Sequence, residues 1–105
     1  EVVVVPFPYV DRLAEKRRPA LVVSTPELLT FNLIWIAMIT SAANRAWPSD
    51  VAIGSLSLAG LPAASVVRPA KIACIEPDRI VKAVGWIDAR ELAAVLKAIG
   101  RYLGL

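Results

Sequence analysis

Short hydrophobic runs alternate with Gly, Pro and polar residues along most of the chain. The runs are rich in β-branched and aromatic residues, which favour strands over helices. This pattern predicts five or six short strands, at residues 2–7, 20–24, 33–39, 65–67, 71–75 and 81–87. It also predicts a single helical turn at residues 26–30. The chain is therefore expected to be mostly β.

Near the end of the sequence the hydrophobic residues change to the spacing of one face of a helix. They are Leu92, Val95, Leu96, Ile99 and Leu103. Asp88, followed three residues later by Glu91, matches a capping box at the start of this helix, and Gly104 suits its end. We expect the helix to cover one side of a strongly bent sheet or small barrel.

The length and composition predict a single globular domain over residues 1–105. The chain has 105 residues, of which 57% are hydrophobic and 20% are charged, which is enough to build one packed core. Its uncharged stretches are interrupted and shorter than the roughly 20 apolar residues that a membrane-spanning helix needs. No export signal is recognised, and the lone Cys74 cannot form an internal disulfide. We therefore expect a cytoplasmic protein with no membrane segment.

The side-chain inventory excludes most hydrolase chemistries. The chain has no His, so it cannot form a Ser-His-Asp or Cys-His arrangement, and it lacks the usual ligands of a zinc site. Most of its nine acidic residues fall in predicted turns, away from strand ends that could converge on two metal ions. The glycines have no phosphate-loop spacing. No metal or cofactor is expected, and the remaining chemistry is that of Arg, Lys, hydroxyl and backbone groups.

That inventory suits the cleavage of RNA. RNA carries its own nucleophile, the 2′-hydroxyl, so an enzyme need only align it and stabilise the charged transition state. Arginine binds phosphate oxygens with two parallel hydrogen bonds and stays charged at cellular pH. The net charge is +3, and Lys16, Arg17 and Arg18 form a basic cluster before a predicted strand. Such a triplet is also common in a solvated turn.

Five motifs follow one another along the chain. They are VVVVPFPY at residues 2–9, KRRPALVVS at 16–24, AMITS at 37–41, GLP at 60–62 and SVVR at 65–68. Each motif is weak alone, but their order and spacing closely resemble the MazF/PemK toxin family over essentially the whole chain. The resemblance implies an SH3-like β-barrel with a C-terminal helix. It further implies a symmetric dimer that cleaves single-stranded RNA, leaving a 2′,3′-cyclic phosphate and a 5′-hydroxyl, and an antitoxin that occupies the RNA groove.

The resemblance also assigns roles to individual residues. Arg18, directly before Pro19, corresponds to the catalytic arginine of the family, and Thr40 corresponds to its catalytic hydroxyl residue. The remaining candidates are RNA-binding residues, namely Lys16, Arg17, Ser41, Arg45, Trp47, Arg68 and Lys71. In the better-studied pattern an acid and usually a Gln follow the SVVR motif. Here Ala70 and Lys71 occupy those places, so no carboxylate base is assigned, and Lys71 is a candidate phosphate contact.

Each catalytic candidate also has a structural alternative. Arg18 could be a charge that protects an edge strand from aggregation. Thr40 could be a strand-end hydroxyl that closes a turn. Arg68 could pair with Asp50 or Glu76 on the surface.

The three tryptophans are expected to differ in role. Trp47 lies in a polar loop beside Arg45 and Pro48, where it could stack on a base or cap the loop. Trp35 alternates with apolar neighbours and is predicted to lie in the core. Trp86 falls in the last predicted strand and is expected to serve packing.

Two further expectations concern partners and function. A domain of this size buries only about two thirds of the surface that its unfolded chain exposes, so with 57% hydrophobic residues we expect an uncovered apolar surface and a homodimer.

The alternative function is a non-catalytic toxin of the same fold that binds a protein target such as DNA gyrase, or an inactive RNA-binding relative. Gyrase poisons of that kind carry a Trp near the C-terminus. The last residues here are Tyr102-Leu103-Gly104-Leu105, which favours the ribonuclease.

Overall fold

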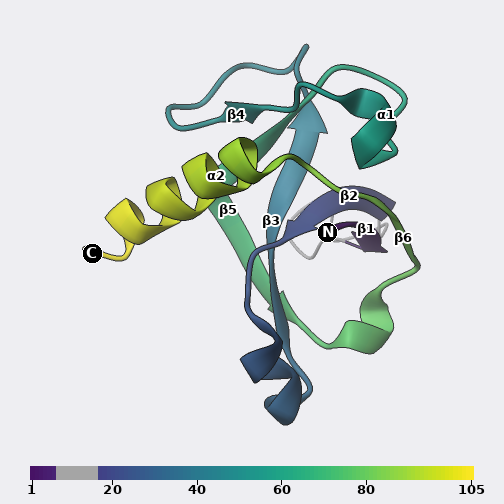
Figure 1. Ribbon diagram of the computed structural model, residues 1–105, viewed down its shortest axis with the longest axis vertical. Helices are drawn as coiled ribbons and strands as arrows, with labels where there is room; N and C mark the ends of the chain where they lie inside the picture. The colour runs from purple at the N-terminus through teal and green to yellow at the C-terminus, as the bar shows by residue number, and fades with distance from the viewer. Residues whose placement is uncertain (7–16) are drawn as a thin grey trace.

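The structure is a computed structural model that describes residues 1–6 and 17–105. The described strands form one antiparallel sheet in the order β4-β5-β3-β2-β1-β6 (Figure 1). The strands are β1 (Val2–Pro6), β2 (Arg17–Val22), β3 (Ile34–Ser41), β4 (Val51–Ala52), β5 (Ser65–Ile75) and β6 (Lys82–Gly85). The helical segments are the 3-10 helices η1 (Pro26–Phe31) and η2 (Pro77–Arg79) and the α-helices α1 (Leu56–Ala59) and α2 (Ala89–Tyr102).

Strand β3 is the centre of the sheet and contributes buried side chains to both faces. Ile36 and Met38 belong to a core on one face, together with residues of β1 and β2. Ala37 and Ile39 belong to a second core on the opposite face, where Val95 of α2 is completely buried. Since successive side chains of a strand point to opposite faces, one uninterrupted hydrophobic run can build both cores.

Strands β3 and β5 pair along their whole length, with one irregularity. The partners shift from Ala37 with Ile72 to Met38 with Arg68, so the intervening residues 69–71 form a bulge in β5. Pro69 lies in this bulge, and because a proline cannot donate to a ladder, bulges are among the few places in a sheet that accept one. The two strands predicted at residues 65–67 and 71–75 are therefore one bulged strand.

Helix α2 covers one face of the sheet, and its predicted boundaries are confirmed. Asp88 Oδ1 accepts a hydrogen bond of 2.8 Å from the Glu91 N–H, and Glu91 Oε1 accepts one of 3.4 Å from the Asp88 N–H, which completes the capping box. Gly104, just beyond the helix, has a φ of 81°, a conformation that favours glycine. Figure 1 shows α2 passing in front of β5.

The predicted mostly β fold with a C-terminal helix is confirmed, but the sheet is not closed. In the described part of the chain the edge strands β4 and β6 are not paired with each other. Figure 1 shows β2 curving away from the direction of β3, so the sheet is bent without completing a barrel. Among the described residues, no helix is both long and apolar enough to cross a membrane.

Two tryptophan predictions are wrong. Trp35 is 43% exposed, because its side chain falls on the α2 side of β3, where it lines an open hollow between the sheet and α2. Trp86 is 59% exposed and lies just after β6, where its N–H donates to the Leu58 carbonyl oxygen at 2.9 Å. Its backbone therefore joins β6 to α1, while the residue itself remains largely exposed.

Candidate functional site

Arg18 and Thr40 lie on the same face of the sheet, near the same end of the β2–β3 ladder. In that ladder Ala20 lies opposite Met38. Arg18 is two residues before Ala20, and Thr40 is two residues after Met38. Because every second side chain of a strand points to the same face, Arg18 and Thr40 lie on the face that Ala20 and Met38 share. Arg68 of β5 lies opposite Met38 on its other side. Three candidate residues from three adjacent strands therefore share one face.

Arg18 is half-buried near the start of β2. Its Nε is buried and has no hydrogen-bond partner in the part of the chain that the structure describes. A buried donor without a partner costs about 1–3 kcal/mol, and an anion that accepted this hydrogen bond would remove that cost. Strand β2 lies between β1 and β3, but its pairing with β3 covers only residues 20–22, and Arg18 pairs with Val5 of β1. The edge-strand alternative for Arg18 therefore stays a prediction.

Thr40 is buried, with 5% of its surface exposed. Its Oγ1 accepts a hydrogen bond of 2.7 Å from Asn44 Nδ2. The turn-closing contact considered for this residue is therefore present. Asn44 lies outside the family motifs. Its only signal in the sequence is an amide side chain four residues after Thr40, in a segment rich in small residues.

Arg68 anchors the loop of residues 42–50 to β5. Its Nε and Nη2 donate to the two carboxylate oxygens of Asp50 at 3.1 and 3.0 Å, and Nη2 also donates to the Arg45 carbonyl oxygen at 2.9 Å. The side chains of Arg68 and Asp50 are only 8% and 9% exposed. Pairing with Asp50 is thus realised, and Glu76 instead accepts from Asn32 at 3.4 Å. The RNA contact predicted for Arg68 stays a prediction.

Trp47 forms a cation-binding platform in the same loop. The Arg68 Cζ atom lies 4.2 Å from the centroid of its ring, and Lys71 Nζ lies 5.6 Å from that centroid. Both distances are within the range of cation–π attraction. The Trp47 N–H donates to Asp50 Oδ2 at 2.9 Å, and the residue remains 39% exposed. Trp47 therefore caps the Arg68–Asp50 pair while leaving part of its surface open.

The Asp50 carboxyl has a pKa below its ordinary value of 3.8. Burial by itself raises the pKa, but the hydrogen bonds from Arg68 and from the Trp47 N–H, together with the charge of Arg68, outweigh it. Asp50 is therefore a carboxylate at neutral pH and a weak base. Among the described residues no group of three or more acids or cysteines could hold a metal ion.

The remaining candidates are placed less centrally. Ser41 ends β3 and is exposed, and its Oγ accepts from the Ala43 N–H at 3.1 Å. Arg17 is exposed at the start of β2, opposite Pro6. Lys16 lies outside the described residues. The structure thus brings Thr40, Arg45, Trp47, Arg68 and Lys71 together around one loop, with Arg18 on the same face of the sheet.

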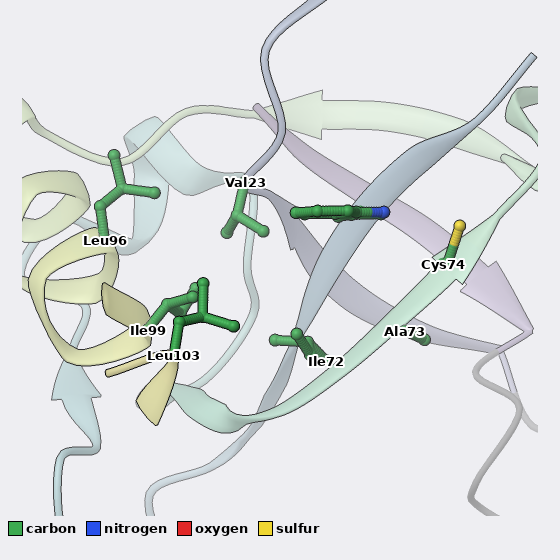
Figure 2. Close-up of a pocket in the computed structure, with 8 residues that line it drawn as sticks. Val23, Ile72, Ala73, Cys74, Leu96, Ile99 and Leu103 are labelled. Carbon is green, nitrogen blue, oxygen red and sulfur yellow. The ribbon is translucent and has the colours of Figure 1, made fainter. Parts of the chain in front are cut away.

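A separate apolar hollow of about 390 Å³ lies between α2 and the sheet. In Figure 2, Leu96, Ile99 and Leu103 of α2 face Ile72 and Cys74 of β5 across it. Val23, Trp35 and Ala73 complete its lining. The hollow contains none of the charged candidates and belongs to the face opposite to that of Arg18.

The family resemblance is confirmed by comparison with known proteins. A family model described as "PemK-like, MazF-like toxin of type II toxin-antitoxin system" matches residues 1–103. The chain belongs to this toxin family. Comparison with the sequences of curated proteins gives no match.

Solved structures of related toxins share the fold. The toxin MazF-mt6 of Mycobacterium tuberculosis has a TM-score of 0.76 and 21% identity, with 99% of this chain and 96% of that chain covered. MazF of Deinococcus radiodurans has a TM-score of 0.78 and 24% identity, with 99% and 93% covered. A mycobacterial endoribonuclease in complex with its cognate antitoxin has a TM-score of 0.76 and 20% identity, with 99% and 91% covered. The described part of the chain therefore has the MazF fold.

We expect Asp50→Ala to destabilise the toxin by about 3 kcal/mol at pH 7, because it leaves the buried Arg68 charge without its partner. Because folding lowers the pKa of Asp50, the carboxylate stabilises the fold above its ordinary pKa of 3.8. That stabilisation is lost as the pH falls through the lowered value. Urea unfolding of both proteins from pH 7 to pH 3 measures this.

The exposed Asp78 supplies the control, and Asp78→Ala should change the free energy of unfolding by less than about 0.5 kcal/mol. A loss from Asp50→Ala that equals the loss from Asp78→Ala at pH 7 would contradict a stabilising ion pair.

Proposed function

We propose that this chain is the growth-inhibiting toxin of a type II toxin-antitoxin system and acts in the prokaryotic cytoplasm as a sequence-specific, metal-independent endoribonuclease. Its substrate is single-stranded RNA. The observation that carries the proposal is that, in a chain of this family, Arg18 and Thr40 share one face of the sheet near the same end of the β2–β3 ladder. One structural relative is described as an endoribonuclease.

The proposed reaction uses the substrate's own 2′-hydroxyl. The 2′-oxygen attacks the adjacent phosphorus and loses its proton, while the bond from phosphorus to the 5′-oxygen breaks and that oxygen gains a proton. The products are a 2′,3′-cyclic phosphate and a 5′-hydroxyl. Arg18 contacts the scissile phosphate, stabilises the negative charge of the transition state and assists proton transfer, and Thr40 holds the same phosphate.

The described part of the site offers no carboxylate suited to act as the base. Asp50 is occupied by Arg68 and by the Trp47 N–H, and its pKa is lowered. Ala70 stands where the better-studied pattern of the family has an acid. The proposal therefore relies on positioning and electrostatic stabilisation, two effects that can supply much of an enzymatic rate enhancement.

RNA binding is assigned to the basic and aromatic residues around the loop of residues 42–50. Arg45, Trp47 and Lys71 lie around this loop, and Lys16 and Arg17 belong to the basic segment next to Arg18. Ser41 and Arg68 complete the proposed set. Since each phosphate contact releases condensed counterions, RNA affinity should fall steeply with salt. A disordered acidic or amphipathic antitoxin segment would compete for the same groove.

We propose that the chain forms a homodimer whose interface is the apolar surface around the hollow between α2 and the sheet (Figure 2). Trp35 and Leu103, which line it, are 43% and 60% exposed, and Leu105, two residues after Leu103, is 92% exposed. Exposed apolar patches of this kind mark association sites, and a two-fold dimer is the commonest way to cover one.

Purified toxin should cleave a long single-stranded RNA at the same rate in excess chelator as in magnesium. The reason is that the nucleophile belongs to the RNA and the proposed charge stabilisation comes from Arg18. Gel analysis of RNA and of DNA with the same sequence measures this. Activity that requires magnesium, or equal cleavage of DNA, would contradict the proposal. An absence of any cleavage would favour the non-catalytic alternative.

Arg18→Ala and Thr40→Ala should each lower the cleavage rate by roughly two to three orders of magnitude, as expected for losing one preorganised contact to a charged transition state. Arg18→Lys should also be impaired, since an ammonium group cannot make the paired contacts of a guanidinium. Single-turnover kinetics measures these rates. The exposed neighbour gives the control, because Arg17→Ala should weaken binding without lowering the rate at saturating RNA. Full activity in either alanine variant would remove that residue from the site.

Trp35→Arg should convert the dimer to a monomer at micromolar concentration, because it places a charge in the proposed apolar interface. Trp86→Arg is the matched control: Trp86 is even more exposed but does not line the hollow, so this variant should remain dimeric. Light scattering of the three proteins measures their masses. A monomeric wild type, or dissociation by both variants alike, would rule out this interface.

A further inference from the structure

The hydroxyl of Thr40 is held in one orientation by a neighbour that the proposed mechanism does not use. Asn44 Nδ2 donates to Thr40 Oγ1 at 2.7 Å, the shortest side-chain hydrogen bond among the described residues of the candidate site. Thr40 itself is 5% exposed, so few water molecules can compete for its oxygen. Asn44, by contrast, lies in the exposed loop that follows β3.

Backbone hydrogen bonds fix the position of Asn44. Its N–H donates to the Ser41 carbonyl oxygen at 3.1 Å, and the Ala42 N–H donates to the Ala64 carbonyl oxygen at 2.9 Å. On its other side, the Arg45 carbonyl oxygen accepts from Arg68 at 2.9 Å. The turn therefore presents the Asn44 amide to Thr40 through contacts before and after it, and this arrangement needs no ligand.

The polarity of this hydrogen bond decides what Thr40 can do. A threonine hydroxyl has one proton and two acceptor lone pairs, and an amide –NH₂ group can only donate. While Asn44 donates to Oγ1, the hydroxyl proton is not used in that contact and can be donated to another acceptor. A phosphate oxygen accepts such a hydrogen bond strongly because it is charged.

We propose that Asn44 is a positioning residue that fixes the Thr40 hydroxyl as a hydrogen-bond donor to a phosphate oxygen of the RNA. This inference rests on the proposed ribonuclease function. Without Asn44 the hydroxyl can rotate and donate to a nearby backbone carbonyl instead, as threonine side chains commonly do. The contact to the phosphate is then formed in only a fraction of the bound complexes.

The first test is Asn44→Leu, which keeps the approximate size of the side chain and removes the donor. We expect kcat to fall about tenfold, the size of losing one modest hydrogen bond, while KM and the thermal unfolding midpoint stay within about twofold and 2 °C of wild type. The matched control is Asn32→Leu, which removes the other Asn of the chain, and it should leave kcat unchanged.

The deciding test is a double-mutant cycle between Asn44→Leu and Thr40→Val. If Asn44 acts through the hydroxyl, Asn44→Leu should have no further effect once Thr40 is Val. If Asn44 contacts the RNA itself or only holds the loop, the two losses should multiply, and this result would overturn the inference. If the wild-type protein does not cleave RNA, the ribonuclease proposal and the inference are overturned together. If the wild type is active and the two reductions in kcat multiply, the inference alone is overturned.

Asn44→Asp gives an independent readout. At neutral pH the carboxylate can only accept, so it should draw the Thr40 proton toward itself and lower kcat further than Leu does. As the pH falls toward about 4, a protonated Asp regains a donor, so the deficit relative to wild type should shrink. In the Thr40→Val background this recovery should disappear. Recovery of equal size in that background would show that charge alone is responsible and would contradict the proposed role.

Discussion

The ion pair between Arg68 and Asp50 connects strand β5 to the loop of residues 42–50, around which most of the candidate site lies. Both side chains are nearly buried, and removing one partner of such a pair is far more costly than breaking a surface contact. At the adjacent position, Ser49 Oγ accepts from Arg101 at 2.8 Å and from Tyr102 at 3.1 Å, which ties the same loop to the end of α2. The loop is thus held by the sheet and by the helix before any ligand arrives.

Much of the fold could be predicted because its signals are local. The capping box of α2 and the hydrophobic run of β3 depend on residues close together in sequence. Strand β4 and helix α1 were missed because segments of two and four residues are too short to show a period. The exposure of Trp35 depends on how far α2 extends over the sheet, which is a tertiary property. The bulge at Pro69 likewise depends on pairing with a distant strand.

The candidate site was predictable in residue type more than in arrangement. The family motifs singled out Arg18, Thr40 and Arg68, and their common face follows from the register of three strands. The sequence left open whether Arg68 would pair with an acid, because its partner Asp50 is 18 residues away. Asn44 was missed because its role depends on a single hydrogen bond formed by the conformation of the turn. Contacts of this kind have no sequence period or composition that would reveal them.

The central claim is that the RNA supplies the nucleophile and the protein aligns and stabilises it. The most direct measurement uses an RNA with a single 2′-deoxy substitution on the 5′ side of one mapped cleavage position. If the RNA supplies the nucleophile, cleavage should stop at that position only, while every unmodified position is still cut to a 2′,3′-cyclic phosphate and a 5′-hydroxyl. Cleavage at the substituted position, or products that carry a 5′-phosphate, would contradict it.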